Sequence, residues 1–323
     1  MFSFESLLAA YCSRLASPRP PTASRSSPIH CYMLQSMFKR QTTGSVVCAS
    51  CGSLVGVNDE QCYTCGRRNP GLWGYGQALR RLGTDFGFVP LVIYGCAILY
   101  MLTLVVTMMF GGNVMGGGLF SLLAPADGVA LLFGMSGAYP VFGLHRWWTI
   151  LSAGWLHGSA LHILFNLMWV RDLGPPVADI FGPARLIIIY TVSSACGFLL
   201  SSVMGLLLPG VPLLGGAAYT LGASAAICGL VGALLHYGNR GGSSMIRSHA
   251  ISCAVTIFVS GLIMWRVDNW AHAGGFVGGY LTSMWLDPLK PERVNHMVGA
   301  LVCLLATVLA ILASVVSTLR LVM

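Results

Sequence analysis

Seven long apolar segments constrain this chain more than any other feature of its sequence. A helical membrane span needs roughly 20 mostly apolar residues. Segments that reach or approach this length lie at about 88–110, 153–171, 184–208, 219–238, 248–266, 269–286 and 298–319. The composition agrees, because 55% of the residues are hydrophobic and only 9% are charged, whereas a soluble domain carries about a quarter charged residues. The sequence therefore predicts a helical integral membrane protein.

The basic residues between these segments predict the orientation. If the N-terminus is cytoplasmic, most Lys and Arg residues fall inside, while Arg146, Arg266 and Arg320 fall outside, as the positive-inside rule favours. The net charge of +8 is explained by this bias, so no nucleic-acid partner is expected. Residues 111–152 then form a long, apolar external loop, which we expect to lie in the membrane interface.

Four cysteines form a tight cluster before the first apolar segment. Cys48-x2-Cys51 and Cys62-x2-Cys65, with ten residues between the pairs, have the spacing of a four-thiolate zinc site. A glycine follows each pair, as the tight turns of zinc-ribbon knuckles require. A redox pair or an iron–sulfur cluster is the alternative. With the N-terminus inside, the module is cytosolic, and its zinc is expected to be structural, serving stability or the docking of a cytosolic partner.

Polar side chains inside a membrane are costly, so each of them needs a reason. His157, His162 and Asn166 lie in the second segment, Ser224 in the fourth and His272 in the sixth. In the predicted topology these segments run in the same direction, and His157, Ser224 and His272 each lie near the segment start. Their common depth favours one shared pocket, although a serine among small residues is by itself more often packing than a nucleophile.

Small residues predict that the fourth and sixth segments pack closely. His272 shares a helix face with Gly275 and Gly279, which form a GxxxG pair that lets a second backbone approach. The fourth segment offers a matching face, made of Ala225, Gly229 and Ala233. Packing of these faces would carry His272 toward Ser224, and a serine hydroxyl beside a histidine base is the minimal activated nucleophile.

The stretches HGSALHILFN (157–166), GASA (222–225) and AHAGGFVGG (271–279) together resemble the rhomboid family of intramembrane serine proteases. The resemblance covers about residues 88–286. It implies that Ser224 is the nucleophile and His272 the general base, and that His162 and Asn166 join the Ser224 N–H in an oxyanion hole. The supporting positions that it implies are His157, Gly222, Cys228, Gly275 and Gly279.

Three positions depart from the family pattern. Trp148-Thr149 aligns with the usual Trp-Arg pair of the external loop, which leaves the loop-anchoring role of the displaced Arg146 open. Ala225 replaces a glycine after the serine, and Cys228 replaces an aromatic residue that often stacks on the histidine. Asp268, one turn before His272, is expected to be a helix N-cap rather than an orienting acid. The site is therefore predicted to be a Ser-His dyad.

These features predict an all-α membrane protein with a six-helix rhomboid core plus one C-terminal transmembrane helix, preceded by a small four-cysteine zinc-ribbon-like module. The expected parts are a disordered segment (1–44), the module (45–70), a linker (71–87), the protease core (88–286), and a linker with the seventh helix (287–323). Disorder is favoured for the Ser-, Pro- and Arg-rich residues 1–36. A transit peptide, or an upstream extension before a start at Met33 or Met37, is the alternative.

The expected function is an intramembrane serine endopeptidase that cleaves transmembrane-helix substrates near the external membrane face. Its partners are transmembrane proteins and the lipid bilayer. Its cofactor is the structural zinc, with none needed for catalysis, and its expected location is a bacterial plasma membrane. The alternatives are a non-catalytic rhomboid-like protein that binds membrane clients, and a transporter with a polar midplane site.

Overall fold

The computed structural model describes residues 40–115, 118, 121–211, 215–241, 243–263 and 267–322. The expectations for residues 1–36 lie outside this part of the chain. The described chain divides into two compact units, with the boundary between Phe86 and Gly87 in the sequence. Each unit is treated by itself below.

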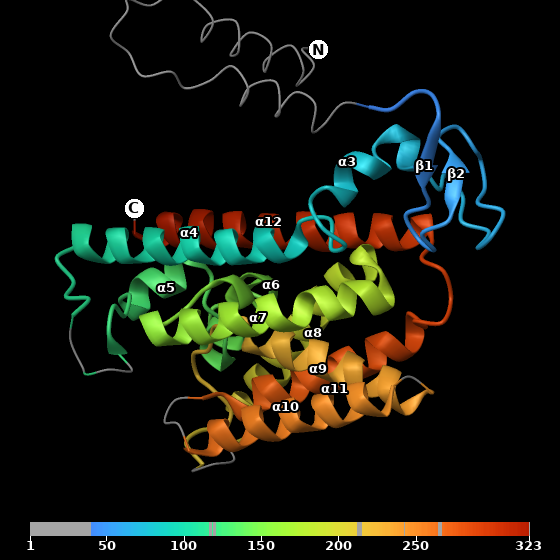
Figure 1. Ribbon diagram of the computed structural model, residues 1–323. Coiled ribbons are helices and arrows are strands. Elements are labelled where there is room, and N and C mark those ends of the chain that lie inside the picture. Colours follow the sequence, from blue (N-terminus) through green and yellow to red (C-terminus); the bar gives the residue numbers. More distant parts are fainter. Residues whose placement is uncertain are drawn as a thin grey trace, which may run out of the picture. The chain divides into compact units, whose positions relative to one another are not determined.

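The N-terminal unit is a small hairpin-based module. Strands β1 (Ser45–Val47) and β2 (Leu54–Gly56) pair antiparallel, with Val46 opposite Val55. These two valines and Val57 pack against Cys48 and Cys62 in a core of their own. The predicted linker contains a 3-10 turn, η1 (Leu72–Gly74), and a short helix, α3 (Gly76–Arg80) (Figure 1).

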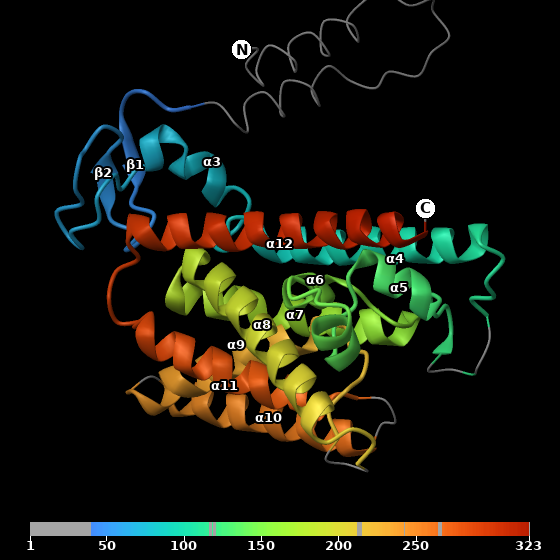
Figure 2. The ribbon, with the colours of Figure 1, turned by 180° about the vertical axis from the view of Figure 1, so that it is seen from behind.

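The second unit is helical, and its seven long helices correspond to the seven apolar segments. They are α4 (Phe88–Met109), α7 (Ala160–Phe181), α8 (Pro183–Leu207), α9 (Ser224–Asn239), α10 (Ser244–Ile263), α11 (Asn269–Trp285) and α12 (Val294–Val322). Between α4 and α7 lie α5 (Asp127–Phe133), the π-helical turn η3 (Tyr139–Gly143), α6 (Thr149–Ser152) and η4 (Ala153–Trp155). In Figures 1 and 2, α4 and α12 run along one side of this unit and α10 along the opposite side.

Four of these helices, α4, α8, α10 and α12, are long and apolar enough to cross a membrane. The protein is therefore an integral membrane protein. α9 and α11 have only 16 and 17 residues, and α7 carries Arg171, Asp172 and Asp179. The count of six core helices plus one stays a prediction.

α9 lies at the centre of the helical unit. It packs on α11, α10, α8 and α7, and residues 225–234 are all buried. The short, glycine-rich α9 and α11 form the most extensive helix pair in the unit. α9 is thus a central helix, whereas α11 leaves Val277, Leu281 and Trp285 exposed on its other face.

Two helices begin later than the apolar pattern predicts. The second segment was expected to be helical from residue 153, but α7 begins at Ala160 because Ser159 caps it, accepting a hydrogen bond from the His162 N–H. His157 therefore precedes the helix. The fourth segment was expected to be helical from residue 219, but residues 217–220 are not helical and hydrogen-bond to residues 136–139. Ser224 is consequently the first residue of α9.

α12 is part of the helical unit, where it packs on α8, α6 and α5. The connector before it is fastened by polar contacts. Glu292 accepts hydrogen bonds from the N–H groups of Ala184 and Arg185 at the start of α8. The buried Arg185 guanidinium donates to the carbonyls of Lys290 and Pro291. These hydrogen bonds therefore join the start of α8 to the connector that precedes α12.

Candidate functional site

Three of the polar residues singled out by the sequence lie in the first turns of three helices. Ser224 begins α9, His272 is the fourth residue of α11, and His162 is the third residue of α7. Asp268 caps α11, because its side chain accepts a hydrogen bond from the Ala271 N–H at 3.0 Å. The N-cap expectation for Asp268 is confirmed, and Ser201 donates a further hydrogen bond to the same carboxylate.

Glycines bring α9 and α11 into backbone contact. A methyl group on Gly275 would lie 2.7 Å from the carbonyl carbon of Ala225 and 3.0 Å from its Cα. One turn later, a methyl group on Gly279 would lie 2.5 Å from the carbonyl carbon of Gly229. The predicted packing of the two small-residue faces is thus confirmed.

This packing brings the chain neighbours of Ser224 and His272 together. Ala225 and Ala271 pack in one buried cluster with Ala153 and Phe198. The structure records no hydrogen bond between the Ser224 hydroxyl and the His272 ring. Nδ1 of His272 is buried and has no hydrogen-bond partner among the described residues.

His162 lies against the backbone that leads to Ser224. A methyl group on Gly222 would lie 2.6 Å from the His162 Nε2 atom, and Gly222 has a left-handed φ of 126°. Only glycine therefore fits this position, on steric and conformational grounds. The His157 ring packs edge-on against the His162 ring, with centroids 5.2 Å apart, and neither nitrogen of His157 has a partner among the described residues.

Asn166 lies one turn after His162 on α7, as the four-residue spacing predicts. It is buried, and its side-chain amide donates a hydrogen bond of 2.8 Å to the carbonyl of His162. An amide nitrogen carries two N–H groups. One of them donates inside the helix, and the structure records no partner for the other among the described residues.

The aromatic neighbour of His272 comes from a helix that the sequence reasoning did not consider. Phe258 on α10 meets the His272 ring at a centroid distance of 6.3 Å and an interplanar angle of 84°, and it meets Phe276 at the same distance. Cys228, which stands where the family often has the aromatic, is buried within α9. Phe258 lies in a uniformly apolar segment, so no local sequence signal distinguishes it.

The start of α9 offers unpaired backbone donors. No side chain caps this helix, whose N-cap residue is Ala223. The first N–H groups of a helix lack intrahelical partners and lie at the positive end of its dipole. The position of Ser224 therefore suits a developing negative charge.

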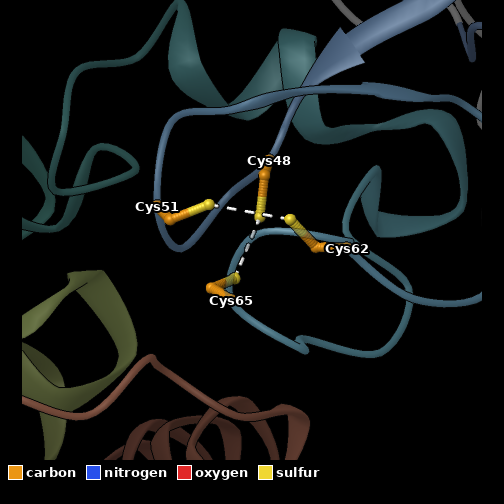
Figure 3. Close-up of side chains that lie close together, drawn as sticks. All are labelled: Cys48, Cys51, Cys62 and Cys65. Carbon is orange, nitrogen blue, oxygen red and sulfur yellow. Dashed lines mark hydrogen bonds between the residues drawn. The ribbon is translucent and has the colours of Figure 1, made fainter.

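The four cysteines form a second site, in the N-terminal unit (Figure 3). The Sγ atoms of Cys48 and Cys65 are 3.8 Å apart, and those of Cys51 and Cys62 are 3.6 Å apart. All four sulfurs lie within 4.8 Å of one another. Zn–S bonds of about 2.3 Å place the sulfurs of a tetrahedron about 3.8 Å apart. The donor set therefore fits a four-thiolate metal site.

The two knuckles that carry the cysteines share one backbone pattern. The Gly52 N–H donates to the Cys48 carbonyl and the Gly66 N–H donates to the Cys62 carbonyl, at 3.1 and 2.8 Å. Both glycines have left-handed φ angles, of 77° and 73°. The predicted need for tight turns after each cysteine pair is confirmed.

The surroundings of the four cysteines shift the pKa values of individual thiols in different directions. Burial raises the pKa of Cys65 to about 12. Burial acts in the same direction on Cys51, but hydrogen bonding with the side chain and backbone of Ser53 outweighs it and lowers the pKa of Cys51 to about 6. Arg80 on α3 donates a 2.7 Å hydrogen bond to the Cys48 carbonyl. The segment predicted as a linker thus contributes a contact to the knuckle.

Comparison with known proteins identifies the helical unit. Residues 144–288 match the Rhomboid domain. The chain is 31% identical over 193 residues to RHOMBOID-like protein 7 of Arabidopsis thaliana, covering 52% of this chain and 55% of that protein. It is 27% identical over 164 residues to Rhomboid protease GluP of Bacillus subtilis, covering 50% of this chain and 30% of the relative.

A third relative is Rhomboid protease GlpG of Pectobacterium atrosepticum, which is 33% identical over 156 residues, covering 46% of this chain and 52% of the relative. The chain spans about half or less of the length of these curated relatives. The matched domain contains the start of α7, the GASA stretch and the glycine face of α11, which are the three elements described above. Residues 144–288 of the helical unit therefore form a Rhomboid domain.

Proposed function

We propose that this protein is an intramembrane serine endopeptidase in which Ser224 is the nucleophile and His272 the general base. The observation that carries the proposal is the backbone contact between Ala225 and Gly275, next to Ser224 and one turn after His272. The buried and unpartnered Nδ1 of His272 supports it. Two relatives whose names call them rhomboid proteases support the same reaction class.

In the proposed reaction, the Ser224 hydroxyl oxygen attacks the carbonyl carbon of a peptide bond in a transmembrane substrate. His272 takes the hydroxyl proton and passes it to the leaving amine, which leaves an acyl-enzyme. Water then attacks the ester while His272 accepts its proton; the bond between the acyl carbon and the Ser224 oxygen breaks, the carboxylic acid product leaves, and His272 returns the proton to the serine oxygen. Substrate helices that contain Gly or Pro unwind at the least cost.

The negative oxygen of the tetrahedral intermediate needs donors at a fixed position. We assign this role to the Ser224 N–H at the start of α9, to the free N–H of the Asn166 amide, and to the His162 ring. Each such donor is typically worth about 10²–10³ in rate. His157, packed on His162, and Gly222, which makes room for its ring, support that donor.

The test is labelling of the purified protein in detergent with a fluorophosphonate probe, which reacts with activated serines. Wild-type protein is expected to label, whereas Ser224→Ala and His272→Ala are expected not to, with unchanged melting temperatures. Full labelling of Ser224→Ala would refute the assignment. Absence of labelling in folded wild-type protein would favour the second candidate, a non-catalytic rhomboid-like protein that binds membrane clients.

We further propose that the four cysteines hold a structural zinc ion. Zinc with four thiolates has no open coordination position, so the ion would stabilise the N-terminal unit and take no part in the cleavage. We propose the topology that the basic residues favour, with this module in the cytosol, the site near the external face, and a bacterial plasma membrane as the location. Labelling of single introduced cysteines from either side of the membrane tests the orientation.

A further inference from the structure

Two side chains of the loop between α4 and α7 (residues 110–159) reach α12. The Trp148 Nε1 atom donates a 3.0 Å hydrogen bond to the Ser314 hydroxyl. The Arg146 Nη1 atom donates a 2.8 Å hydrogen bond to the Thr318 hydroxyl. The partners are 166 and 172 residues apart in the sequence. Arg146, whose role the sequence left open, therefore does anchor the loop.

Because Arg146 and Ser314 are buried, their polar groups need hydrogen-bond partners within the protein. Arg146 is only 3% exposed, and Ser314 is fully buried. Among the described residues, no carboxylate pairs with Arg146, and its other acceptor is the Leu131 carbonyl, at 3.5 Å. A buried charge is tolerated only where acceptors take its donors. Loss of the Thr318 hydroxyl would leave the guanidinium without its nearest acceptor.

The loop backbone is also packed tightly on α12. A methyl group on Gly134 would lie 2.8 Å from the Ser152 Cβ and 2.5 Å from the Ser314 hydroxyl. The Ser152 hydroxyl in turn donates to the Gly134 carbonyl at 2.9 Å. Gly134 is therefore packed tightly between Ser152 and Ser314.

The same loop holds the segment that leads to Ser224. Ser136 and Thr220 exchange two backbone hydrogen bonds, of 3.0 and 2.7 Å. The Gly222 N–H donates to the Ala153 carbonyl at 3.0 Å. Hydrogen bonds therefore join α12 to the loop and the loop to Thr220 and Gly222, which shortly precede Ser224.

We infer that α12 positions the Ser224 segment through the α4–α7 loop, and that Arg146, Trp148, Ser314 and Thr318 are positioning residues for this purpose. None of the four is assigned to touch the substrate. The effect on reactivity rests on the proposed function, whereas the mechanical link does not. In this proposal α12, which lies outside the predicted six-helix core, is necessary for the geometry of the site.

Hydrogen exchange on the full-length protein in detergent tests the link. Thr318→Val is expected to speed exchange of the amides in residues 217–222 by about fivefold or more, as expected when one buried hydrogen bond is lost. Thr318→Ser keeps the hydroxyl and should restore slow exchange. The matched control is Thr307→Val, because Thr307 is a buried α12 residue whose hydroxyl donates only within the helix, to Cys303.

Fluorophosphonate labelling of the same proteins tests the consequence. The labelling rate of Thr318→Val is expected to fall by about fivefold or more, with Thr318→Ser and Thr307→Val close to wild type. If Thr318→Val does not fold, Trp148→Phe is the second variant. It keeps an aromatic side chain but removes the indole N–H that donates to Ser314, together with part of the ring volume, and is expected to have the same two effects.

The outcomes separate the two proposals. Unchanged exchange of residues 217–222 in folded Thr318→Val and Trp148→Phe would overturn the link. Faster exchange with an unchanged labelling rate would overturn its role in reactivity. If wild-type protein does not label at all, the proposed function fails, and the exchange measurement alone still decides whether α12 holds the segment.

Discussion

Adding one methyl group at Gly275 should reduce the reactivity of Ser224 while leaving the protein folded. The methyl of Gly275→Ala would lie 2.7 Å from the carbonyl carbon of Ala225. The Ala225 carbonyl oxygen would lie closer still. Because ordinary contacts of carbon begin near 3.5 Å, α9 and α11 must separate by about 1 Å or more at this level. The obstacle is backbone, which cannot rotate away as a side chain would.

Ser224 is the residue before Ala225, so the displacement acts directly on the proposed nucleophile. A misplacement of about 1 Å can cost on the order of 10²-fold in rate. We therefore expect the second-order rate of fluorophosphonate labelling to fall roughly 10- to 100-fold. Overpacking of this kind costs about 1–3 kcal/mol of stability, which a thermal melt records separately.

Gly128→Ala is the control for this change. A methyl group on Gly128, in α5, would meet nothing within 4 Å, so its labelling rate and melting temperature should match wild type. Labelling of folded Gly275→Ala at the wild-type rate would show that the position of Ser224 does not depend on this contact. The main support for the proposed dyad would then be lost.

Three further outcomes are expected. Gly279→Ala should lower stability by about 1–3 kcal/mol, because its methyl would meet the backbone of Gly229; a melting temperature at or above wild type would contradict this packing. Purified protein should contain about one zinc per chain by elemental analysis, and Cys62→Ser should lose it; retention of zinc would exclude the four-thiolate site. Asp268→Ala removes the N-cap of α11 and should cost about 1 kcal/mol; an unchanged thermal melt would show that the cap is dispensable.

Local residue patterns were enough to predict the elements that carry the site. Apolar segments of membrane length located the long helices, because burial in lipid requires an unbroken apolar run. The cysteine spacing and the glycine after each pair predicted the knuckles, since both depend on residues a few positions apart. The GxxxG face on α11 predicted the contact with α9, because small residues leave room for a backbone wherever the two helices meet.

The helix starts at Ala160 and Ser224 could not be predicted from apolar content. Residues 153–159 and 219–223 contain no Asp, Glu, Lys or Arg and run directly into the helices that follow them, so the apolar pattern marks no boundary there. The Ser159 cap sets the first start. The pairing of Ser136 with Thr220, 84 positions away in the sequence, precedes the second. Such a long-range contact leaves no trace in a local window.

The sequence by itself determined the membrane class, the cysteine site, the small-residue faces and the identity of the polar side chains near Ser224. Only the tertiary structure decided what surrounds them. It supplied Phe258 from α10 as the neighbour of His272, and it joined Arg146 and Trp148 to α12. The physical reason is that these contacts depend on how helices far apart in the chain pack. An apolar segment can present many different faces to its neighbours, and its residue pattern does not say which face another helix covers.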